Sequence, residues 1–409
     1  MRRSLGCALI VFAAVAANAQ EAGRLIVRSV EIESQTVTAP INDIVQGPDG
    51  VIYVASGRGV GVFDGVRWGR ARVGTSTRSA TLAVDARGRV WAGGDGDVGW
   101  IGSDSTGHRA FVSLLPHLPE AMRPTGYVRS VHAVGETVYV ATERQLVRWS
   151  ETAPPRRWRS ESAMTVSIAD ETVYVHDGDR GLLRLRGDRL EPVPGADAFR
   201  RPGPVSVVQG PESADLLAIT ERGIWQVVGS RFTRRPTEAD AILARFPARV
   251  EDAAWADGLL ALTTEGGGLV LLRPDGRLHA RLTAETGLPD ATPRAVRLDQ
   301  EGGIWVGSEE GLVRIGAPQA IRQFAEAEGL RGVILDVDQV GERRVVATSN
   351  GLFLEREAGR FVLAPLTAGV CSALVARGGV IVAACARGLF ETDGRATQRV
   401  SAFAASALA

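Results

Sequence analysis

Side chains that could do chemistry are present in this chain, but they do not gather into known catalytic or metal-binding spacings. No two of the five histidines form a His-x-x-x-His pair, although such sites need closely spaced ligands. The histidines fall in different parts of the chain: His108, His117, His132, His176 and His279. There is no Gly-x-Ser-x-Gly sequence, and no cysteine is placed as a nucleophile with a nearby histidine. We therefore predict no catalytic residues, no metal site and no cofactor.

Three glycine-rich stretches imitate functional loops and are better explained as turns. Residues 57–61 space their glycines like a nucleotide-binding loop, but a strand follows them where such a loop needs a helix. Residues 93–97 read Gly-Gly-Asp-Gly-Asp, which begins like a diguanylate cyclase signature and then departs from it. Residues 177–181, together with Asp188, suggest a calcium loop. That loop would need glycine where Leu182 stands, and a bidentate glutamate that is missing.

Two cysteines, Cys371 and Cys385, form the one covalent site that the sequence suggests. They lie symmetrically about a turn at residues 377–379. In an antiparallel hairpin with this centre they face each other, and directly opposed Cβ atoms are about 4.5–5.5 Å apart. A disulfide is possible in an oxidising compartment, and two small buried thiols are the alternative.

The elements that must position these residues follow from a repeat. Residues 294–315 read as strand, turn, strand, turn, strand, with Asp299 and Gly302 in the first turn and a short β-forming run at Ile304–Val306. Degenerate copies recur along the chain, and a repeat of this length decides the fold. Their central positions are 53, 91, 139, 174, 218, 261, 305, 346 and 382. A spacing of roughly 35–48 residues is the period of β-propeller blades.

Composition fits a protein of many short strands and tight turns, because 48 glycines and 19 prolines accompany 45% hydrophobic residues. The 47 basic residues equal the 47 acidic ones, so the formal net charge is zero. A nucleic-acid-binding protein usually has a basic surplus. We therefore predict no nucleic-acid partner.

Residues 1–19 have the features of a signal peptide. Arg2 and Arg3 precede an apolar run, and residues 17–19 read Ala-Asn-Ala, which matches an A-x-A cleavage site. The mature chain would then begin at Gln20. No later stretch of about 20 apolar residues occurs. We predict a periplasmic or secreted protein with no membrane span in this chain.

The repeat count predicts an all-β protein with two parts. Seven copies would complete one ring of four-stranded antiparallel blades over residues 20–317, and a strand predicted at Leu25–Ile32 is placed to complete its last blade. The two copies in residues 318–409 would be the first blades of an incomplete second propeller, because so few repeats cannot bury their own faces. The alternative is one larger ring of eight or nine blades.

The pattern Asp-x-x-Gly-x-Ile-Trp-Val-Gly-x-x-x-Gly-Leu-x-Arg at residues 299–314 resembles the two-component regulator propeller repeat of bacterial sensor proteins. The Gly-Leu-Pro segment at residues 287–289 and the stretch 93–116 resemble neighbouring parts of the same family. In that family the propellers lie in the periplasm, typically as two seven-bladed rings. A small β-sandwich, a membrane helix and a cytoplasmic output domain follow them. The resemblance implies a ligand-sensing region of a receptor whose output domain is absent from this chain.

The tryptophans fall into two groups. Trp91, Trp225 and Trp305 occupy matching strand positions, which predicts packing between blades. The second group lies at or beyond strand ends, beside arginines, where an aromatic side chain can cover a blade rim or bind a ligand or partner. Its members are Trp68, Trp149 and Trp158.

Three functions remain open. We expect a sensor that binds an unidentified small molecule or glycan, or a protein partner, possibly as a homodimer. An exported propeller enzyme, such as a lyase or a glycan-active protein, is the second possibility. The starts of the predicted inner strands offer no acid/base pair for it: Ile41-Asn42-Asp43, Tyr127-Val128-Arg129, Pro204-Val205-Ser206 and Pro293-Arg294-Ala295. A protein-binding scaffold is the third.

Overall fold

The computed structural model describes residues 25–33, 36–38, 40–73, 79–103, 109–124, 126–200, 206–211, 216–221, 223–228, 231–245, 250–316, 323–356 and 359–403. The predicted signal peptide, residues 1–19, and the predicted boundary at 317/318 lie outside these residues. The described chain forms nine four-stranded antiparallel sheets. It divides into two compact units, Leu25–Ile321 and Arg322–Ala409, the second of which also counts residues 1–24. None of the helices described is long and apolar enough to cross a membrane.

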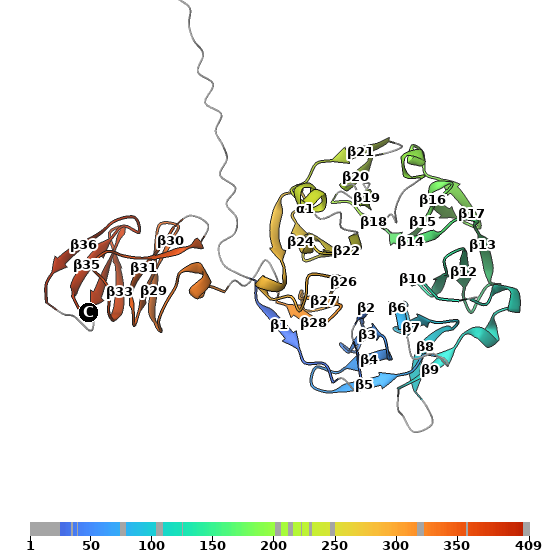
Figure 1. Ribbon diagram of the computed structural model, residues 1–409, viewed down its shortest axis with the longest axis horizontal. Helices are drawn as coiled ribbons and strands as arrows, with labels where there is room; N and C mark the ends of the chain where they lie inside the picture. The colour runs from blue at the N-terminus through green and yellow to red at the C-terminus, as the bar shows by residue number, and fades with distance from the viewer. Residues whose placement is uncertain are drawn as a thin grey trace, which may run out of the picture. The chain divides into compact units, whose positions relative to one another are not determined.

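Seven sheets of the first unit are the blades of a closed ring (Figure 1). Blade 1 consists of β2 (Ile41–Gln46), β3 (Ile52–Ser56), β4 (Gly59–Phe63) and β5 (Trp68–Ala71). Blade 2 consists of β6 (Ser79–Val84), β7 (Val90–Gly94), β8 (Val98–Ser103) and β9 (Arg109–Ser113). Blade 3 consists of β10 (Ser130–Val134), β11 (Thr137–Ala141), β12 (Gln145–Trp149) and β13 (Arg156–Arg159). Blade 4 consists of β14 (Met164–Ala169), β15 (Thr172–Asp177), β16 (Gly181–Arg186) and β17 (Arg189–Pro192). Blade 5 consists of β18 (Ser206–Gln209), β19 (Leu216–Thr220), β20 (Gly223–Val228) and β21 (Arg231–Arg235).

Blade 6 and blade 7 complete the ring. Blade 6 consists of β22 (Val250–Ala256), β23 (Leu259–Thr264), β24 (Gly268–Leu272) and β25 (Leu278–Leu282). Blade 7 consists of β26 (Pro293–Leu298), β27 (Ile304–Ser308), β28 (Leu312–Ile315) and β1 (Val27–Val30). Short helices decorate the connections: η1 (Leu115–His117), η2 (Glu120–Met122), η3 (Ala196–Phe199), α1 (Ala239–Arg245) and η4 (Ala284–Thr286). The inner strand of each blade packs against that of the next, and β26 packs against β2. The seven blades therefore close by themselves, and the larger ring of eight or nine blades does not form.

The N-terminal strand closes the ring, as the sequence predicted. β1 pairs antiparallel with β28, from Val27 opposite Ile315 to Val30 opposite Leu312. Blade 7 is thus built from both ends of the unit, and main-chain hydrogen bonds take the place of a covalent link. Ile315 is fully buried in the core shared by blades 6 and 7. The structure confirms that the predicted strand forms and that it completes the last blade of the ring.

The Asp-x-x-Gly turn of the repeat has a double role. In blade 7, Asp299 Oδ1 accepts the main-chain N–H groups of Glu301 and Gly303 at 3.1 and 2.6 Å. Asp299 Oδ2 accepts the Trp305 indole N–H at 3.0 Å and Arg314 Nε at 2.6 Å. One buried carboxylate therefore fixes the turn and also orients the tryptophan that packs against blade 1. Asp85 repeats this arrangement in blade 2, where it holds Trp91.

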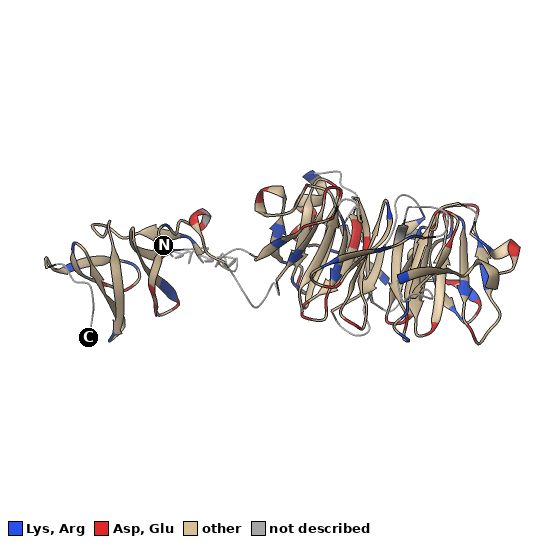
Figure 2. Ribbon diagram, turned by 90° about the horizontal axis from the view of Figure 1, so that it is seen from below, with Lys and Arg blue, Asp and Glu red and all other residues tan. Residues whose placement is uncertain are grey.

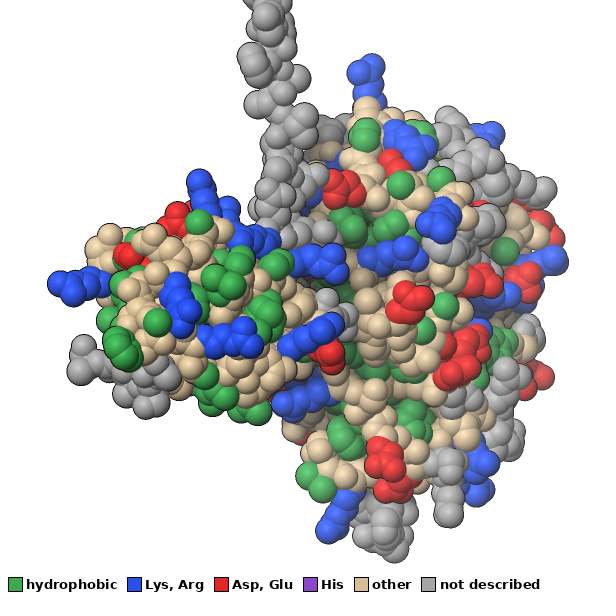
Figure 3. All heavy atoms as spheres, turned by 60° about the vertical axis from the view of Figure 1, so that its left-hand side comes forward, with side chains coloured by type: hydrophobic (Ala, Val, Ile, Leu, Met, Phe, Trp, Pro, Cys, Tyr) green, Lys and Arg blue, Asp and Glu red, His purple; other side chains and the backbone are tan. Residues whose placement is uncertain are grey.

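The second unit contains two blades. Blade 8 consists of β29 (Ile334–Val340), β30 (Arg343–Thr348), β31 (Gly351–Glu355) and β32 (Phe361–Leu363), and η5 (Glu326–Glu328) precedes it. Blade 9 consists of β33 (Cys371–Arg377), β34 (Val380–Cys385), β35 (Gly388–Thr392) and β36 (Thr397–Ser401). The two blades share one hydrophobic core. Hydrophobic side chains also gather on the surface of this unit (Figure 3). In β29, Ile334 and Val337 are 49% and 53% exposed, whereas the matching strand β2 of the ring is largely buried.

Cys371 and Cys385 lie directly opposite each other in β33 and β34, as the position of the turn predicted. The structure joins them in a disulfide with an S–S distance of 2.01 Å. Both residues are buried in the core between blades 8 and 9. The covalent link therefore crosses the inner hairpin of blade 9.

Asp299→Ala should destabilise the ring by about 2–4 kcal/mol, because it leaves the buried Trp305 N–H and two turn N–H groups without acceptors and Arg314 without its carboxylate. The matched control is Asp275→Ala. Asp275 also caps a turn, through the Arg277 N–H, but its side chain is 55% exposed. We expect the control to lose less than about 1 kcal/mol. Urea unfolding of both variants measures the difference, and equal losses would contradict the role given to Asp299.

Candidate functional site: the central channel of the ring

The inner strands of all seven blades surround a central channel of about 670 Å³. Such a volume lies in the range of small-ligand pockets. The polar side chains that line it are Asn42, Asp43, Thr81, Arg129, Ser130, His132, Thr165, Ser167, Asp170, Ser206, Gln209, Glu251, Asp252, Arg294 and Arg297. Around them, charged residues of both signs are spread over the strands and loops of the ring (Figure 2). The channel is therefore a polar site with nearly balanced charge.

An inner strand has a neighbouring strand on one side only, so some of its N–H groups need partners from elsewhere. In blade 1 the strand register shifts between Ile41 and Asp43. After this shift, the Asp43 carboxylate accepts such N–H groups. Asp43 Oδ1 accepts the N–H of Ile44 at 2.9 Å, and Oδ2 accepts the N–H of Leu82 in blade 2 at 2.8 Å. Asp43 thus ties its own strand to the next blade.

Other blades repeat this bridge from the same place. Asp252 in blade 6 follows the same kind of register shift, and its carboxylate accepts the N–H groups of Ala253 at 2.9 Å and of Val296 in blade 7 at 3.1 Å. Thr81 continues the chain of contacts from blade 2, because its hydroxyl donates to Asp43 at 3.3 Å and accepts the Val131 N–H of blade 3 at 3.0 Å. Short polar side chains therefore connect successive inner strands around the channel.

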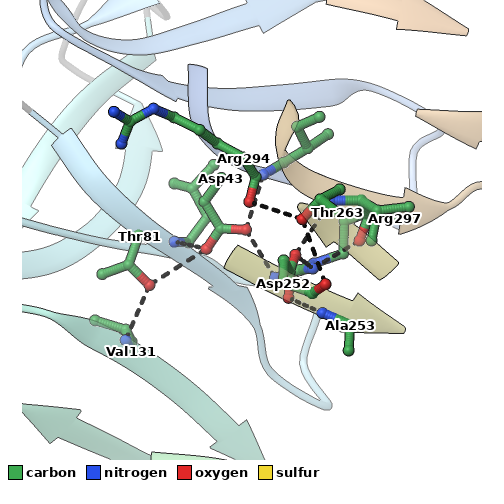
Figure 4. A network of polar contacts seen from close by, with 11 residues as sticks. Asp43, Thr81, Val131, Asp252, Ala253, Thr263, Arg294 and Arg297 are labelled. Carbon is green, nitrogen blue, oxygen red and sulfur yellow. Dashed lines mark hydrogen bonds and ion pairs between the residues drawn. The ribbon is translucent and has the colours of Figure 1, made fainter. Parts of the chain in front are cut away.

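Blade 7 lacks such a side chain, because Ala295 stands at the position of Asp43 and Asp252. Arg297, two residues later, replaces it. Its Nη2 donates to Asp43 Oδ1 of blade 1 at 2.8 Å, and its Nη1 is ion-paired with Asp252 Oδ2 of blade 6 (Figure 4). One guanidinium thus bridges the blades on both sides of blade 7. About a third of its side-chain surface remains exposed to the channel.

Burial and nearby charges shift the pKa values of Asp43, Arg297 and His132. Burial raises the pKa of Asp43, and the Arg297 guanidinium partly opposes that shift. Burial also disfavours the charged form of Arg297, but the carboxylates of Asp252 and Asp43 outweigh it and raise the pKa of Arg297. Burial lowers the pKa of His132 to about 4, and the nearby Arg297 charge adds to the effect. His132 is therefore neutral at pH 7.

The structure shows which of the histidines and suggested metal ligands named from the sequence lie in the channel. Of the four histidines that the structure describes, only His132 lines the channel. His176 bonds the Phe199 carbonyl at 2.7 Å, His279 is buried and His117 lies in η1; His108 lies outside the described residues. Asp177, the first residue of the suggested calcium loop, caps a turn through the N–H groups of Asp179 and Arg180. Among the residues that the structure describes, no three His, Cys, Asp or Glu side chains form a group that could hold a metal.

Sequence reasoning named the starts of several inner strands and missed the network that joins them. Asn42, Asp43, Arg129, Ser206 and Arg294 do line the channel. The partners of Asp43 were missed, and so were Asp252 and Arg297. A signal for the carboxylates was available, since an aspartate follows the register shift in three inner strands: Asp43, Asp252 and Asp336.

Comparison with known proteins places the fold and leaves the family open. No protein-family model matches the chain, and no curated protein matches it. Among solved structures, the chain is similar to the extracellular domain of BT3049 of B. thetaiotaomicron, described as a hybrid two component system, with a TM-score of 0.62 and 15% identity over 92% of this chain. The extracellular domain of BT4673 from the same organism matches with a TM-score of 0.56 and 14% identity over 92% of this chain.

The chain spans about half the length of these extracellular domains, 54% and 53% respectively. A streptogramin B lyase structure is also similar, with a TM-score of 0.54 and 12% identity over 73% of this chain and 99% of that one. At these identities the likeness establishes the fold alone. The fold is a β-propeller, and it resembles sensor domains of signalling systems as well as a lyase.

Arg297→Met should cost about 2–4 kcal/mol at pH 7.5, because it leaves the buried carboxylate of Asp43 without its cation. The pKa of Asp43 would rise further. A carboxyl group with a raised native pKa binds protons more readily in the native state, so its cost grows as the pH rises through that pKa and shrinks as the pH falls. We therefore expect the loss relative to the native sequence to be smaller at pH 5 than at pH 7.5 in urea unfolding.

The matched control for this variant is Arg294→Met, on the same strand. Arg294 also lines the channel but pairs with Glu309 in a half-exposed setting. Its loss should stay below about 1 kcal/mol and should not depend on pH in this range. Equal losses for the two variants, or a larger loss at pH 5 for Arg297→Met, would contradict the bridging role of Arg297.

Proposed function

We propose that this chain is an exported ligand-sensing β-propeller region of a bacterial signal-transduction receptor, whose output domain lies outside this chain. The observation that carries the proposal is the central channel: all seven blades contribute side chains to a polar cavity of about 670 Å³. Clefts of this size with a few placed polar groups are the usual sites of small ligands. The ring acts by binding and does no chemistry of its own.

Two further observations support the receptor interpretation. The chain shares its fold with extracellular domains of two-component systems. Its N-terminal residues have the pattern of a signal peptide, and its disulfide belongs to an oxidising compartment. Both features fit a sensor that meets its ligand outside the cytoplasm.

Binding in the channel would act on the ring through residues already described. Asp43, Asp252 and Arg297 line the cavity and also connect blades 6, 7 and 1. A ligand that contacts them differently in two arrangements of the ring would shift the balance between those arrangements. The ligand that fits best is a small polar molecule or a sugar unit, because hydroxyl groups can both donate to the carboxylates and accept from Arg297.

Export predicts a defined covalent state. When the full chain is produced in a bacterium with a periplasm, the mature protein should appear in the periplasmic fraction and begin at Gln20. Cys371 and Cys385 should resist alkylation until a reductant and a denaturant are added. Intact-protein mass spectrometry measures both. A cytoplasmic protein that keeps residues 1–19, or one with two free thiols, would contradict the export part of the proposal.

Ligand binding in the channel predicts a thermal shift that one bulky side chain removes. A ligand that binds the native ring at a hundred times its dissociation constant stabilises it by about 2.7 kcal/mol. A screen of sugars and oligosaccharides should therefore contain compounds that raise the unfolding temperature. Thr165→Trp, which fills the channel, should abolish the shift, whereas Thr233→Trp on the outer strand β21 should keep it.

The same compounds separate the alternatives. If chromatography shows that a bound compound is converted into a product, the protein is an enzyme and not a sensor. A thermal shift that survives Thr165→Trp would move the site away from the channel. Stabilisation only by another protein would favour a scaffold.

A further inference from the structure

A second cavity of the ring lies between blade 7 and blade 1, with a volume of about 750 Å³. We call it the seam groove. Blade 7, the strand β1 with the residues after it, and blade 1 with its turns all line the groove. It is separate from the channel, and its ligand is independent of the function proposed for that site.

Aromatic rings form one side of the seam groove. Phe63 and Trp68 are stacked with their ring centroids 4.8 Å apart and an interplanar angle of 29°. Trp305 of blade 7 meets Phe63 edge-on at 6.3 Å. The Trp68 indole N–H donates to the Glu31 carbonyl at 2.9 Å, which holds this ring against β1. The sequence allowed two roles for Trp68, which were covering a blade rim or binding a ligand or partner.

The junction of blades 2 and 3 has an equivalent aromatic contact, but ion pairs connect its two blades. There Trp91 of blade 2 meets Trp149 of blade 3 at 5.5 Å. Arg87 forms ion pairs with Glu136 and Glu151 of blade 3, and Arg89 also pairs with Glu151. We call this set the Arg–Glu bridge. In this junction one blade supplies the cations and the other supplies the carboxylates.

Strand register gives the equivalent residues in the seam. Ile52 faces Phe63 in blade 1 as Val138 faces Trp149 in blade 3. Leu298 faces Ile304 in blade 7 as Val84 faces Val90 in blade 2. The four residues of the Arg–Glu bridge then correspond as follows: Arg87 to Glu301, Arg89 to Gly303, Glu136 to Gly50 and Glu151 to Gly65. Three glycines and one acid therefore stand where the bridge would be.

The charges that remain in the seam groove are mostly negative. Four exposed carboxylates line it, and Arg28 is the one exposed cation among the lining residues: Glu31, Glu33, Asp64, Glu301 and Arg28. Arg314 is committed to the buried carboxylate of Asp299 at 2.6 Å and reaches Glu301 only at 3.8 Å. Main-chain N–H groups of Arg67 and Val66 lower the pKa of Asp64, so it stays ionised at neutral pH. Both walls of the groove are acidic.

We propose that the seam groove binds a guanidinium group, presented by a small guanidino compound or by an arginine side chain of a peptide. Two acidic walls cannot pair with each other, so a cation that enters the groove can pair with carboxylates on both. A planar guanidinium suits both features of the groove, because it stacks on aromatic rings and pairs with carboxylates. Arg89 is an internal precedent, since its guanidinium lies 5.2 Å from the Trp91 ring while it pairs with Glu151.

Calorimetric titration of the mature chain with Nα-acetyl-arginine amide, and with the neutral isostere Nα-acetyl-citrulline amide, tests the proposal. The arginine compound should bind and the citrulline compound should not. The indole N–H resonance of Trp68, assigned with Trp68→Phe, should shift with the arginine compound. Glu301→Gln should weaken binding about fivefold, because it removes one exposed ion pair, and Glu301→Arg should abolish it by supplying the cation internally.

Glu143→Gln is the matched control, because Glu143 is an exposed acid in blade 3, outside the seam groove. It should leave binding unchanged. A short peptide with a central arginine identifies the source: tighter binding than the amide indicates a peptide, and equal binding indicates a small guanidino compound. Equal binding of the citrulline isostere, an unmoved Trp68 resonance, or equal losses in Glu301→Gln and Glu143→Gln would each overturn the proposal.

Discussion

A carboxylate or hydroxyl on one inner strand that accepts an N–H from the next inner strand is the contact on which the ring depends. The inner strand of a blade has a hydrogen-bonding neighbour on one side only, and its free N–H groups face the channel or the adjacent blade. Asp43 and Asp252 satisfy one such group in their own strand and one in the next blade. Asp336 does the same between blades 8 and 9, with Val337 and Leu374. The contact therefore belongs to the repeat itself and occurs in both units.

Blade 7 shows what happens when the repeat omits this contact. Ala295 cannot bridge, and Arg297 takes over by pairing with an aspartate on each side. This exchange has a consequence for function, because it places a partly exposed guanidinium inside the channel. The same residue then serves ring closure and the chemistry of the cavity. Under the proposed function, changes at Arg297 would affect stability and binding together, and variants such as Thr165→Trp are needed to separate the two.

Much of the fold follows from the sequence, whereas the channel network does not. The turn at Asp299 and Gly302 and the strand before the first repeat were enough to predict the blades and the closing strand, because these are local patterns with a fixed period. The ion pair between Asp43 and Arg297 joins residues 254 positions apart. Its geometry depends on how the first and last blades meet, and no local pattern encodes that. The recurrence of aspartate at Asp43, Asp252 and Asp336, after the register shift of three inner strands, was not recognised as a bridge.

Divergence of the repeats gives two equivalent blade junctions different charged residues. Blades 2 and 3 and blades 7 and 1 share the same aromatic contact, so the scaffold beneath the surface is conserved between the two junctions. Replacing the Arg–Glu bridge with glycines and Glu301 removes side-chain volume and leaves carboxylates on both walls. Neither change disturbs the buried Asp299, which still fixes its turn and Trp305. A propeller can therefore change the charge and side-chain volume of a blade junction through its exposed residues, while the buried contacts that define the blade stay in place.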